Sequence, residues 1–64
     1  MDERIRFIRI PEVIKLVGMS KSTIWARSKD GTFPAPRKIG PGVTVWVESE
    51  IQSWMKQQLE KSEG

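Results

Sequence analysis

The strongest constraint on the fold of this chain is a helix stop followed almost at once by a helix start. Gly18 favours the left-handed position just after a helix, and Ser20 is a preferred N-cap residue. Before the glycine, Val13, Ile14 and Val17 recur at helical spacing and form one apolar stripe. The sequence therefore predicts two short helices that meet at a tight corner.

The second helix, between Ser20 and Gly31, is expected to bury little of its surface. Ile24 is its one clearly apolar anchor, and a rotation of about 100° per residue places Ser28 near the same side. The opposite side carries Ser22, Trp25, Ala26 and Lys29, so apart from the tryptophan its side chains are small, polar or basic. A helix with such an exposed side is suited to entering a DNA groove.

Extended structure is predicted on both sides of the corner. Apolar and basic residues roughly alternate over residues 4–10, which indicates a short extended segment. After the corner, Pro34 and Pro36 exclude helix. A β-hairpin is then predicted, with arms at residues 37–39 and 43–47 and a glycine-rich turn at 40–42.

A last helix is predicted over residues 48–56 or a few residues more, with either Glu48 or Ser49 as its cap. Its buried side comprises Ile51, Trp54 and Met55, with Leu59 as a further candidate. A helical corner followed by a hairpin is the arrangement of a winged helix-turn-helix, in which the hairpin is the wing. The predicted fold is thus mainly α with a small β-hairpin, in a single domain over residues 1–64. Its core spans about residues 5–59 and its tail frays over residues 60–64.

The composition argues against catalysis and metal binding. The chain has no cysteine and no histidine, so it lacks thiolate ligands, the commonest metal ligand and the usual general base. Its serines and threonines have no base to activate them, and no phosphate-binding glycine motif is present. We therefore expect a protein that is not an enzyme and uses no metal or cofactor. A signal peptide and a long apolar run are also missing, so a cytoplasmic location is expected.

The net charge of +3 conceals an uneven distribution of charge. Residues 4–38 carry nine basic and two acidic side chains, whereas residues 48–64 carry two basic and four acidic ones. A basic face confined to the first two thirds of the chain is what a polyanion-binding protein requires. Taken alone, this charge is equally compatible with a solvated basic surface.

The candidate DNA-binding residues lie on the second helix and at the root of the wing. The N-terminal part of a recognition helix meets base edges, where serine and lysine form hydrogen bonds and Ala26 can touch a thymine methyl group. Basic residues at the root of the wing can hold the phosphate backbone. These candidates are Lys21, Ser22, Trp25, Ala26, Lys29, Arg37 and Lys38.

A second interpretation is a protein-interaction module. Trp25 could pack over the hairpin, or it could act with the apolar wing residues Val43, Val45 and Val47 to grip a recombinase or a polymerase. Salt dependence separates the two functions, because phosphate contacts weaken steeply as salt rises and apolar contacts change little.

Five runs of residues form a recognisable pattern. They are Arg9-Ile10-Pro11-Glu12-Val13, Gly18-Met19-Ser20-Lys21-Ser22-Thr23-Ile24-Trp25, Gly31-Thr32-Phe33-Pro34-Ala35-Pro36-Arg37-Lys38-Ile39-Gly40, Trp46-Val47-Glu48-Ser49-Glu50-Ile51 and Trp54-Met55. Together they cover roughly residues 5–56 and resemble the AlpA family of prophage regulatory proteins.

The resemblance implies a MerR-like winged helix similar to that of phage excisionases. It implies a sequence-specific protein that binds double-stranded DNA, regulates transcription or acts as a recombination directionality factor, and loads cooperatively in several copies. The implied partners are double-stranded DNA, further copies of the chain and an integrase, with no membrane and no small-molecule ligand. Residue by residue, it assigns Lys21, Ser22, Thr23, Trp25 and Ala26 to the recognition helix and Arg37 and Lys38 to the start of the wing. Residues 41–45 depart from the family pattern because they include no basic residue.

Overall fold

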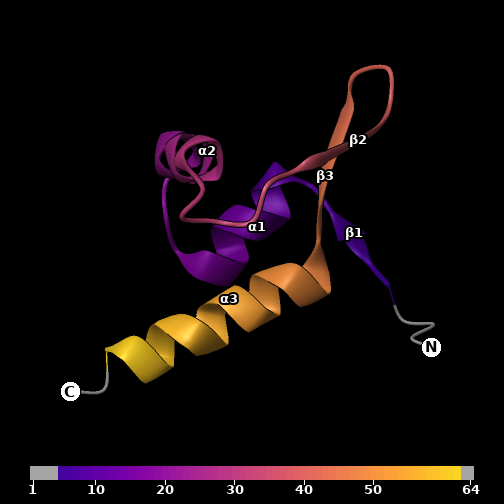
Figure 1. Cartoon of the computed structure of the whole chain (residues 1–64). Helices are drawn as coiled ribbons and strands as arrows, with labels where there is room; N and C mark the ends of the chain where they lie inside the picture. Colours follow the sequence, from indigo (N-terminus) through magenta and orange to yellow (C-terminus); the bar gives the residue numbers. More distant parts are fainter. Residues whose placement is uncertain (1–4, 63–64) are drawn as a thin grey trace.

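Three helices and a three-stranded antiparallel sheet make up residues 5–62, the part of the chain that the computed structural model describes (Figure 1). The elements in chain order are β1 (Phe7–Ile8), α1 (Ile10–Val17), α2 (Lys21–Asp30), β2 (Arg37–Gly40), β3 (Val43–Val47) and α3 (Glu48–Lys61). The strand order is β1-β3-β2, and β2 and β3 form a hairpin that projects beyond the helices (Figure 1). This arrangement confirms the predicted winged helix-turn-helix.

Both helix boundaries at the corner lie where the sequence predicts them. Gly18 adopts a φ of 73°, a left-handed conformation, and its N–H donates to the carbonyl of Ile14 at 2.9 Å. The hydroxyl of Ser20 accepts a hydrogen bond from the N–H of Thr23 at 3.3 Å, which is the expected N-cap contact. Gly31 ends α2 with a φ of 87°. These caps close the helix ends with only two residues, Met19 and Ser20, between Gly18 and α2.

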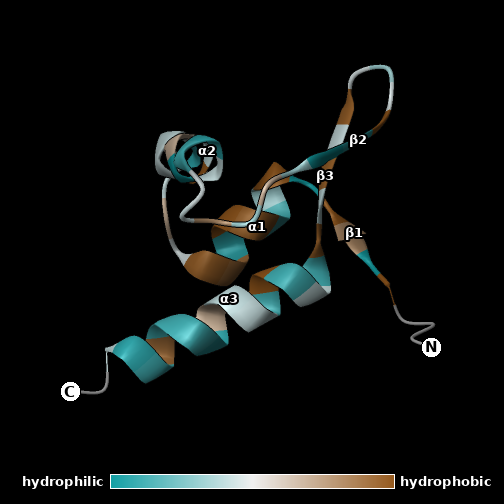
Figure 2. Cartoon of the chain, in the orientation of Figure 1, coloured by the Kyte–Doolittle hydropathy of each residue, from teal (hydrophilic) through white to brown (hydrophobic). Residues whose placement is uncertain are grey.

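The core is built around Trp46 of β3, whose side chain is 1% exposed. Each helix contributes one fully buried residue to it, namely Val13 from α1, Ile24 from α2 and Ile51 from α3, and all three are 0% exposed. Ile8 and Phe33 complete the buried cluster. In Figure 2, α2 carries mainly hydrophilic colours, as expected for a helix held by one apolar anchor. The sequence predicted this role for Ile24.

The pairing of the strands defines two faces of the sheet. Paired residues in antiparallel strands share a face, and successive residues alternate between faces. Because Ile8 pairs with Trp46, and Lys38 with Thr44, these residues share the face that turns toward α2, here called the inner face. The outer face carries the alternate residues, which are Phe7, Arg37, Val45 and Val47.

The loop between α2 and β2 is fixed by side chains from three different elements. The carbonyl of Pro34 accepts hydrogen bonds from the indole N–H of Trp46 at 3.0 Å and from the hydroxyl of Ser28 at 3.3 Å. The indole N–H of Trp54 donates to the carbonyl of Thr32 at 2.8 Å. Between these bonds, Phe33 is buried and meets Trp54 edge to face, with ring centroids 4.8 Å apart. The loop therefore joins α2, the wing and α3.

Some expectations at the edges of the elements were wrong. Neither Glu48 nor Ser49 caps α3, because β3 runs directly into the helix and Val47 occupies the cap position without a side-chain bond. The N–H of Glu48 instead donates to the carbonyl of Arg6 at 2.8 Å. Leu59 does not belong to the buried stripe. It is 72% exposed, since the end of α3 extends past the other elements (Figure 1).

The two ends of the described chain also differ from expectation. The extended segment predicted over residues 4–10 is reduced to β1, because Ile10 already belongs to α1, and residue 4 lies outside the described residues. Fraying was expected from residue 60, yet α3 includes Glu60 and Lys61. Residues 63 and 64 lie outside the described residues.

Removal of the α2 anchor should destabilise the protein strongly. We expect Ile24→Ala to lower the free energy of unfolding by about 2–5 kcal/mol, because the side chain is fully buried and the space it leaves cannot be refilled. The matched control is Leu59→Ala, which should change stability by less than about 0.5 kcal/mol at an exposed helical position. Urea denaturation measures both. Equal losses in the two variants would contradict the assignment of Ile24 to the core.

Two serine-to-alanine substitutions on α2 test whether the hydrogen bond from Ser28 to the loop stabilises the fold. Ser28→Ala removes a donor to Pro34, whereas Ser22→Ala removes an exposed hydroxyl. Both substitutions gain the same helix propensity, so the difference between them isolates the hydrogen bond. We expect Ser28→Ala to be less stable than Ser22→Ala by about 1 kcal/mol, measured by thermal or urea denaturation. Identical stabilities would show that the bond to the loop contributes nothing.

Candidate nucleic-acid interface

The side of α2 opposite its anchor is open to solvent, as the sequence predicted. Ser22, Ala26 and Lys29 are all exposed, while Ser28 on the anchored side is half-buried. Lys21, the first residue of the helix, is also exposed. Ala26 has no side chain beyond Cβ, so another molecule can approach the helix closely at that point. The helix therefore presents a small and polar surface with basic residues at both ends.

Trp25 belongs partly to this surface and partly to the core. It is 39% exposed, and its ring centroid lies 5.1 Å from that of Trp46, with the ring planes tilted by 60°. A tilted aromatic pair at this separation is stabilising. Trp25 therefore packs over the hairpin, and part of its side chain also remains exposed. Through this contact, Trp25 joins α2 to the root of the wing.

The hydroxyl of Thr23 is used within the cap of α2. The hydroxyl of Ser20 donates to Thr23 Oγ1 at 2.9 Å, and the N–H of Thr23 donates to Ser20 Oγ at 3.3 Å. Thr23 is nonetheless exposed and lies next to Ser22 and Lys21. Its first contribution is to fix the start of the helix that carries the other candidates.

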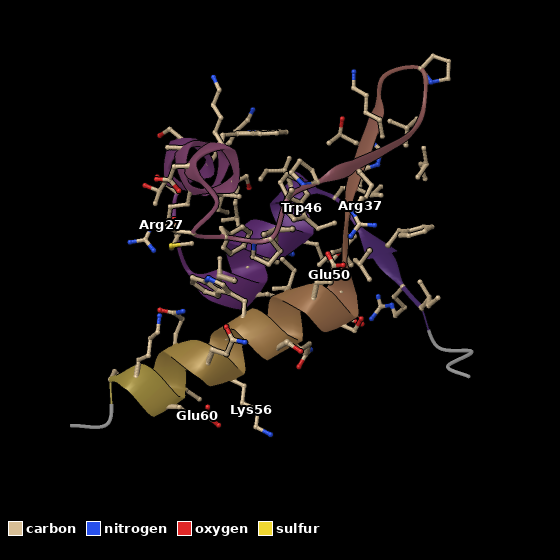
Figure 3. The ribbon with its side chains drawn as sticks, in the orientation of Figure 1. Arg27, Arg37, Trp46, Glu50, Lys56 and Glu60 are labelled. Carbon is tan, nitrogen blue, oxygen red and sulfur yellow. The ribbon has the colours of Figure 1, made fainter. Side chains whose placement is uncertain are left out.

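The two basic residues at the root of the wing point to opposite faces of the sheet. Arg37 lies on the outer face, where its Nη2 donates to Glu50 Oε2 at 2.6 Å, and Figure 3 shows the two side chains turned toward each other. Lys38 is exposed on the inner face, next to Thr44 and toward α2. The structure thus brings Lys38 to the candidate surface and leaves Arg37 away from it. Alternation along a strand could have separated these neighbours from sequence alone.

The wing itself is less apolar on its surface than the sequence suggested. Val45 is 4% exposed, and Val43 and Val47 are half-buried, so these valines do not form the bare apolar grip of the protein-interaction interpretation. The exposed apolar residue of the hairpin is Ile39, at 53%. The tip turns at Pro41 and Gly42, and Gly42 needs its left-handed φ of 69°.

Acidic side chains near the interface are held by specific partners. At the end of α2, the carboxylate of Asp30 accepts bonds from Thr32 Oγ1 at 2.7 Å and from Thr32 N at 3.0 Å. The side-chain bond from Thr32 is the main reason that the pKa of Asp30 lies below its usual value, and the backbone bond adds to it. At the start of α3, Glu48 pairs with Arg6 at 3.1 Å. Neither ion pair, Arg6–Glu48 or Arg37–Glu50, was predicted from the sequence, because each joins residues that are distant in the chain.

Few other chemical sites are available. Over residues 5–62, no three acidic side chains gather closely enough to hold a metal ion. None of the helices in that range combines the length and the apolar character that a membrane span requires. The surface of α2 and the wing is therefore the candidate site.

Comparison with known proteins identifies relatives over most of the chain. ORF88 of Enterobacteria phage P4, an uncharacterised protein, is 42% identical over 50 residues, which are 78% of this chain and 57% of that protein. The chain thus spans little more than half the length of this phage relative. The DNA-binding transcriptional activator AlpA of Escherichia coli strain K12 is 39% identical over 59 residues, which cover 83% of this chain and 84% of that protein. No solved structure gives a significant match.

A family model supports the same relationship. The model described as prophage CP4-57 regulatory protein (AlpA) matches residues 6–59, which include every described helix and strand except the last two residues of α3. The resemblance inferred from the motifs is confirmed. The chain belongs to the AlpA family of prophage regulatory proteins.

Proposed function

We propose that this protein is a sequence-specific DNA-binding regulator, in which α2 enters the major groove of duplex DNA. The observation that carries the proposal is the exposure of Ser22, Ala26 and Lys29 on a helix held from behind by Ile24. Serine and lysine can hydrogen-bond to base edges, and Ala26 can lie against a thymine methyl group. The name of the Escherichia coli relative, a DNA-binding transcriptional activator, supports the same function. A regulator of this kind acts in the cytoplasm, on the nucleoid.

Phosphate contacts are assigned to basic residues around this helix. Lys21 lies at the start of α2, Lys29 at its end and Lys38 on the inner face of the wing. These positions surround the base-reading residues, so the three ammonium groups can fix the register of α2 in the groove. Arg37 has a different role in this proposal, because its bond to Glu50 holds the root of the wing against α3.

Several copies are expected to bind together. A single small DNA-binding module buries roughly 600–1,000 Å² of protein surface, so one copy on one site should bind weakly. Repeated sites loaded cooperatively would raise the affinity. A titration followed by gel shift, in which an isolated site is filled by a single independent copy with high affinity, would contradict this part of the proposal.

Control of transcription and control of excision both require site-specific binding to DNA. We favour transcriptional regulation, because the Escherichia coli relative is named an activator, and we retain excision as a second role that the integrase would share. Deleting the gene and measuring integrase transcript and excised element separately distinguishes the two. Selecting bound fragments from the host genome identifies the target sequence.

Binding to a protein partner remains the competing function. One observation favours it, namely that Trp25 is 39% exposed, since exposed tryptophans often anchor protein interfaces. The burial of Val45 removes part of the surface that such an interface would use. A DNA complex should weaken by orders of magnitude between about 50 and 200 mM salt, whereas an apolar protein contact should not.

Placing a charge in the groove should abolish most DNA binding. We expect Ala26→Glu to weaken binding to the selected sequence by about 10- to 100-fold, because a carboxylate at this position meets base edges and phosphates. The matched control is Gln52→Glu, which adds the same charge at an exposed position of α3. Fluorescence anisotropy with labelled duplex measures both. If Ala26→Glu binds as well as the parent, α2 is not the recognition helix.

The two neighbouring basic residues at the root of the wing, Arg37 and Lys38, should affect DNA binding differently. We expect Lys38→Gln to reduce the slope of log affinity against log salt by about one unit, as one phosphate contact is lost. Arg37→Gln removes the same charge from the outer face and should leave the slope almost unchanged. Binding measured over a series of salt concentrations gives both slopes. A larger effect from Arg37 than from Lys38 would contradict the proposed orientation of the wing.

A further inference from the structure

A hollow of about 540 Å³ lies between the start of α1, α2 and the wing. Its lining includes Arg9, Pro11, Trp25, Gly42, Thr44 and Trp46. It adjoins the exposed side of α2 through Trp25 and the inner face of the wing through Thr44. Neither the sequence analysis nor the comparisons assign a ligand to this hollow.

We propose that the hollow seats one sugar–phosphate strand of duplex DNA, with a deoxyribose against Trp25 and a neighbouring phosphate held by Arg9. The inference rests on the proposed function and adds to it a strand-binding site and one new DNA-contacting residue. It also gives Trp25 a definite role, which is contact with the backbone rather than with a base.

The chemistry of the walls suits a deoxyribose. The exposed side chains of Trp25 and Pro11 provide mainly C–H surface, which matches the C–H surface of the sugar. Trp25 is supported from behind by its contact with Trp46, so its exposed ring is held in place before DNA arrives. When a site is already formed in the free protein, binding costs little free energy for ordering its side chains.

The charge at the hollow suits a phosphate. Arg9 is exposed and is the one charged residue in the lining, since no carboxylate contributes to it. Among residues 5–62, ion pairs are present for Arg6 and Arg37 and not for Arg9, so its guanidinium is free to bind. The charged residues of α1, Glu12 and Lys15, are both outside the lining. Lys38 is outside the lining and pairs with Thr44, which belongs to it.

The position of the hollow also suits a strand. A helix that lies in the major groove has a sugar–phosphate strand along its side, and here the hollow runs beside α2 up to the wing. At the wing side, Gly42 presents no side chain, and a Cβ built there would meet nothing within 4 Å. The wing can therefore lie close to the strand although its tip carries no basic residue.

The test uses a mixed-sequence duplex of about 30 base pairs, because a contact with sugar and phosphate does not depend on base sequence. Arg9→Gln should weaken binding to this duplex by about tenfold and lower the salt slope by about one unit. Trp25→Leu should weaken binding by about threefold to tenfold with an unchanged salt slope. The same fold-changes are expected with the selected genomic sequence, so the preference for that sequence over the mixed duplex should be retained.

Matched controls lie outside the lining of the hollow. Arg6→Gln removes an arginine paired with Glu48, and Phe7→Leu removes an aromatic ring that is 52% exposed on the outer face. Both should bind the mixed duplex within about twofold of the parent. Thermal denaturation of every variant checks that it is folded at the assay temperature. Should Trp25→Leu fail to fold, Arg9→Gln decides the question alone.

The outcomes separate this inference from the proposed function. Loss of binding in Arg9→Gln with the predicted change in slope, and no loss in Arg6→Gln, supports the strand site. If Arg9→Gln and Trp25→Leu bind like their controls while the parent still prefers the selected sequence, the strand site is overturned and the function stands. If the parent binds neither duplex, the proposed function and the strand site are both overturned.

Discussion

The hydrogen bond from the indole of Trp46 to the carbonyl of Pro34 is the contact on which the rest of the structure depends. Trp46 lies at the centre of the core, and the same side chain holds the loop that separates the helical corner from the wing. Ser28 donates to the same carbonyl from α2, and Trp54 of α3 donates to the carbonyl of Thr32, two residues earlier in the loop. Three elements are thus positioned by one short loop that has no regular structure of its own.

This arrangement explains how 64 residues without a disulfide can fix the geometry of a binding surface. A chain of this length buries a small core, and the tryptophans contribute both apolar area and a donor group. Within residues 5–62, no buried side-chain nitrogen or oxygen lacks a partner. The helix α2 can therefore have a single buried residue, because its position is set by Ile24, Ser28 and the Trp25–Trp46 contact rather than by a broad buried stripe.

Local signals in the sequence were sufficient to predict most of the fold. Gly18, Ser20 and Gly31 act through the backbone conformations and caps that their side chains favour, so their effects do not depend on distant residues. The burial of Val13, Ile24 and Ile51, one on each helix, followed from periodicity for the same reason. The cap of α3 could not be predicted in this way, since the N–H of Glu48 is satisfied by the carbonyl of Arg6, which lies just before β1 and is distant in the chain.

The candidate site was predictable to a lesser extent. Exposure of Ser22 and Ala26 followed from the position of Ile24 on the same helix, which is a short-range relationship. The pairing of Arg37 with Glu50 joins two elements and depends on the twist and register of the hairpin. The hollow beside Trp25 is formed by three separate segments of the chain, so no local sequence pattern predicts it.

The buried residue that anchors α2 and the residues that α2 exposes to solvent are different, and this difference has an evolutionary consequence. Ser22, Ala26 and Lys29 lie outside the core, so exchanging them costs little folding free energy. Under the proposed function, single substitutions at these three positions can change the preferred DNA sequence while the scaffold stays unchanged. Trp25 lacks this freedom, because the side chain that faces outward also rests on Trp46, and selection on one role constrains the other.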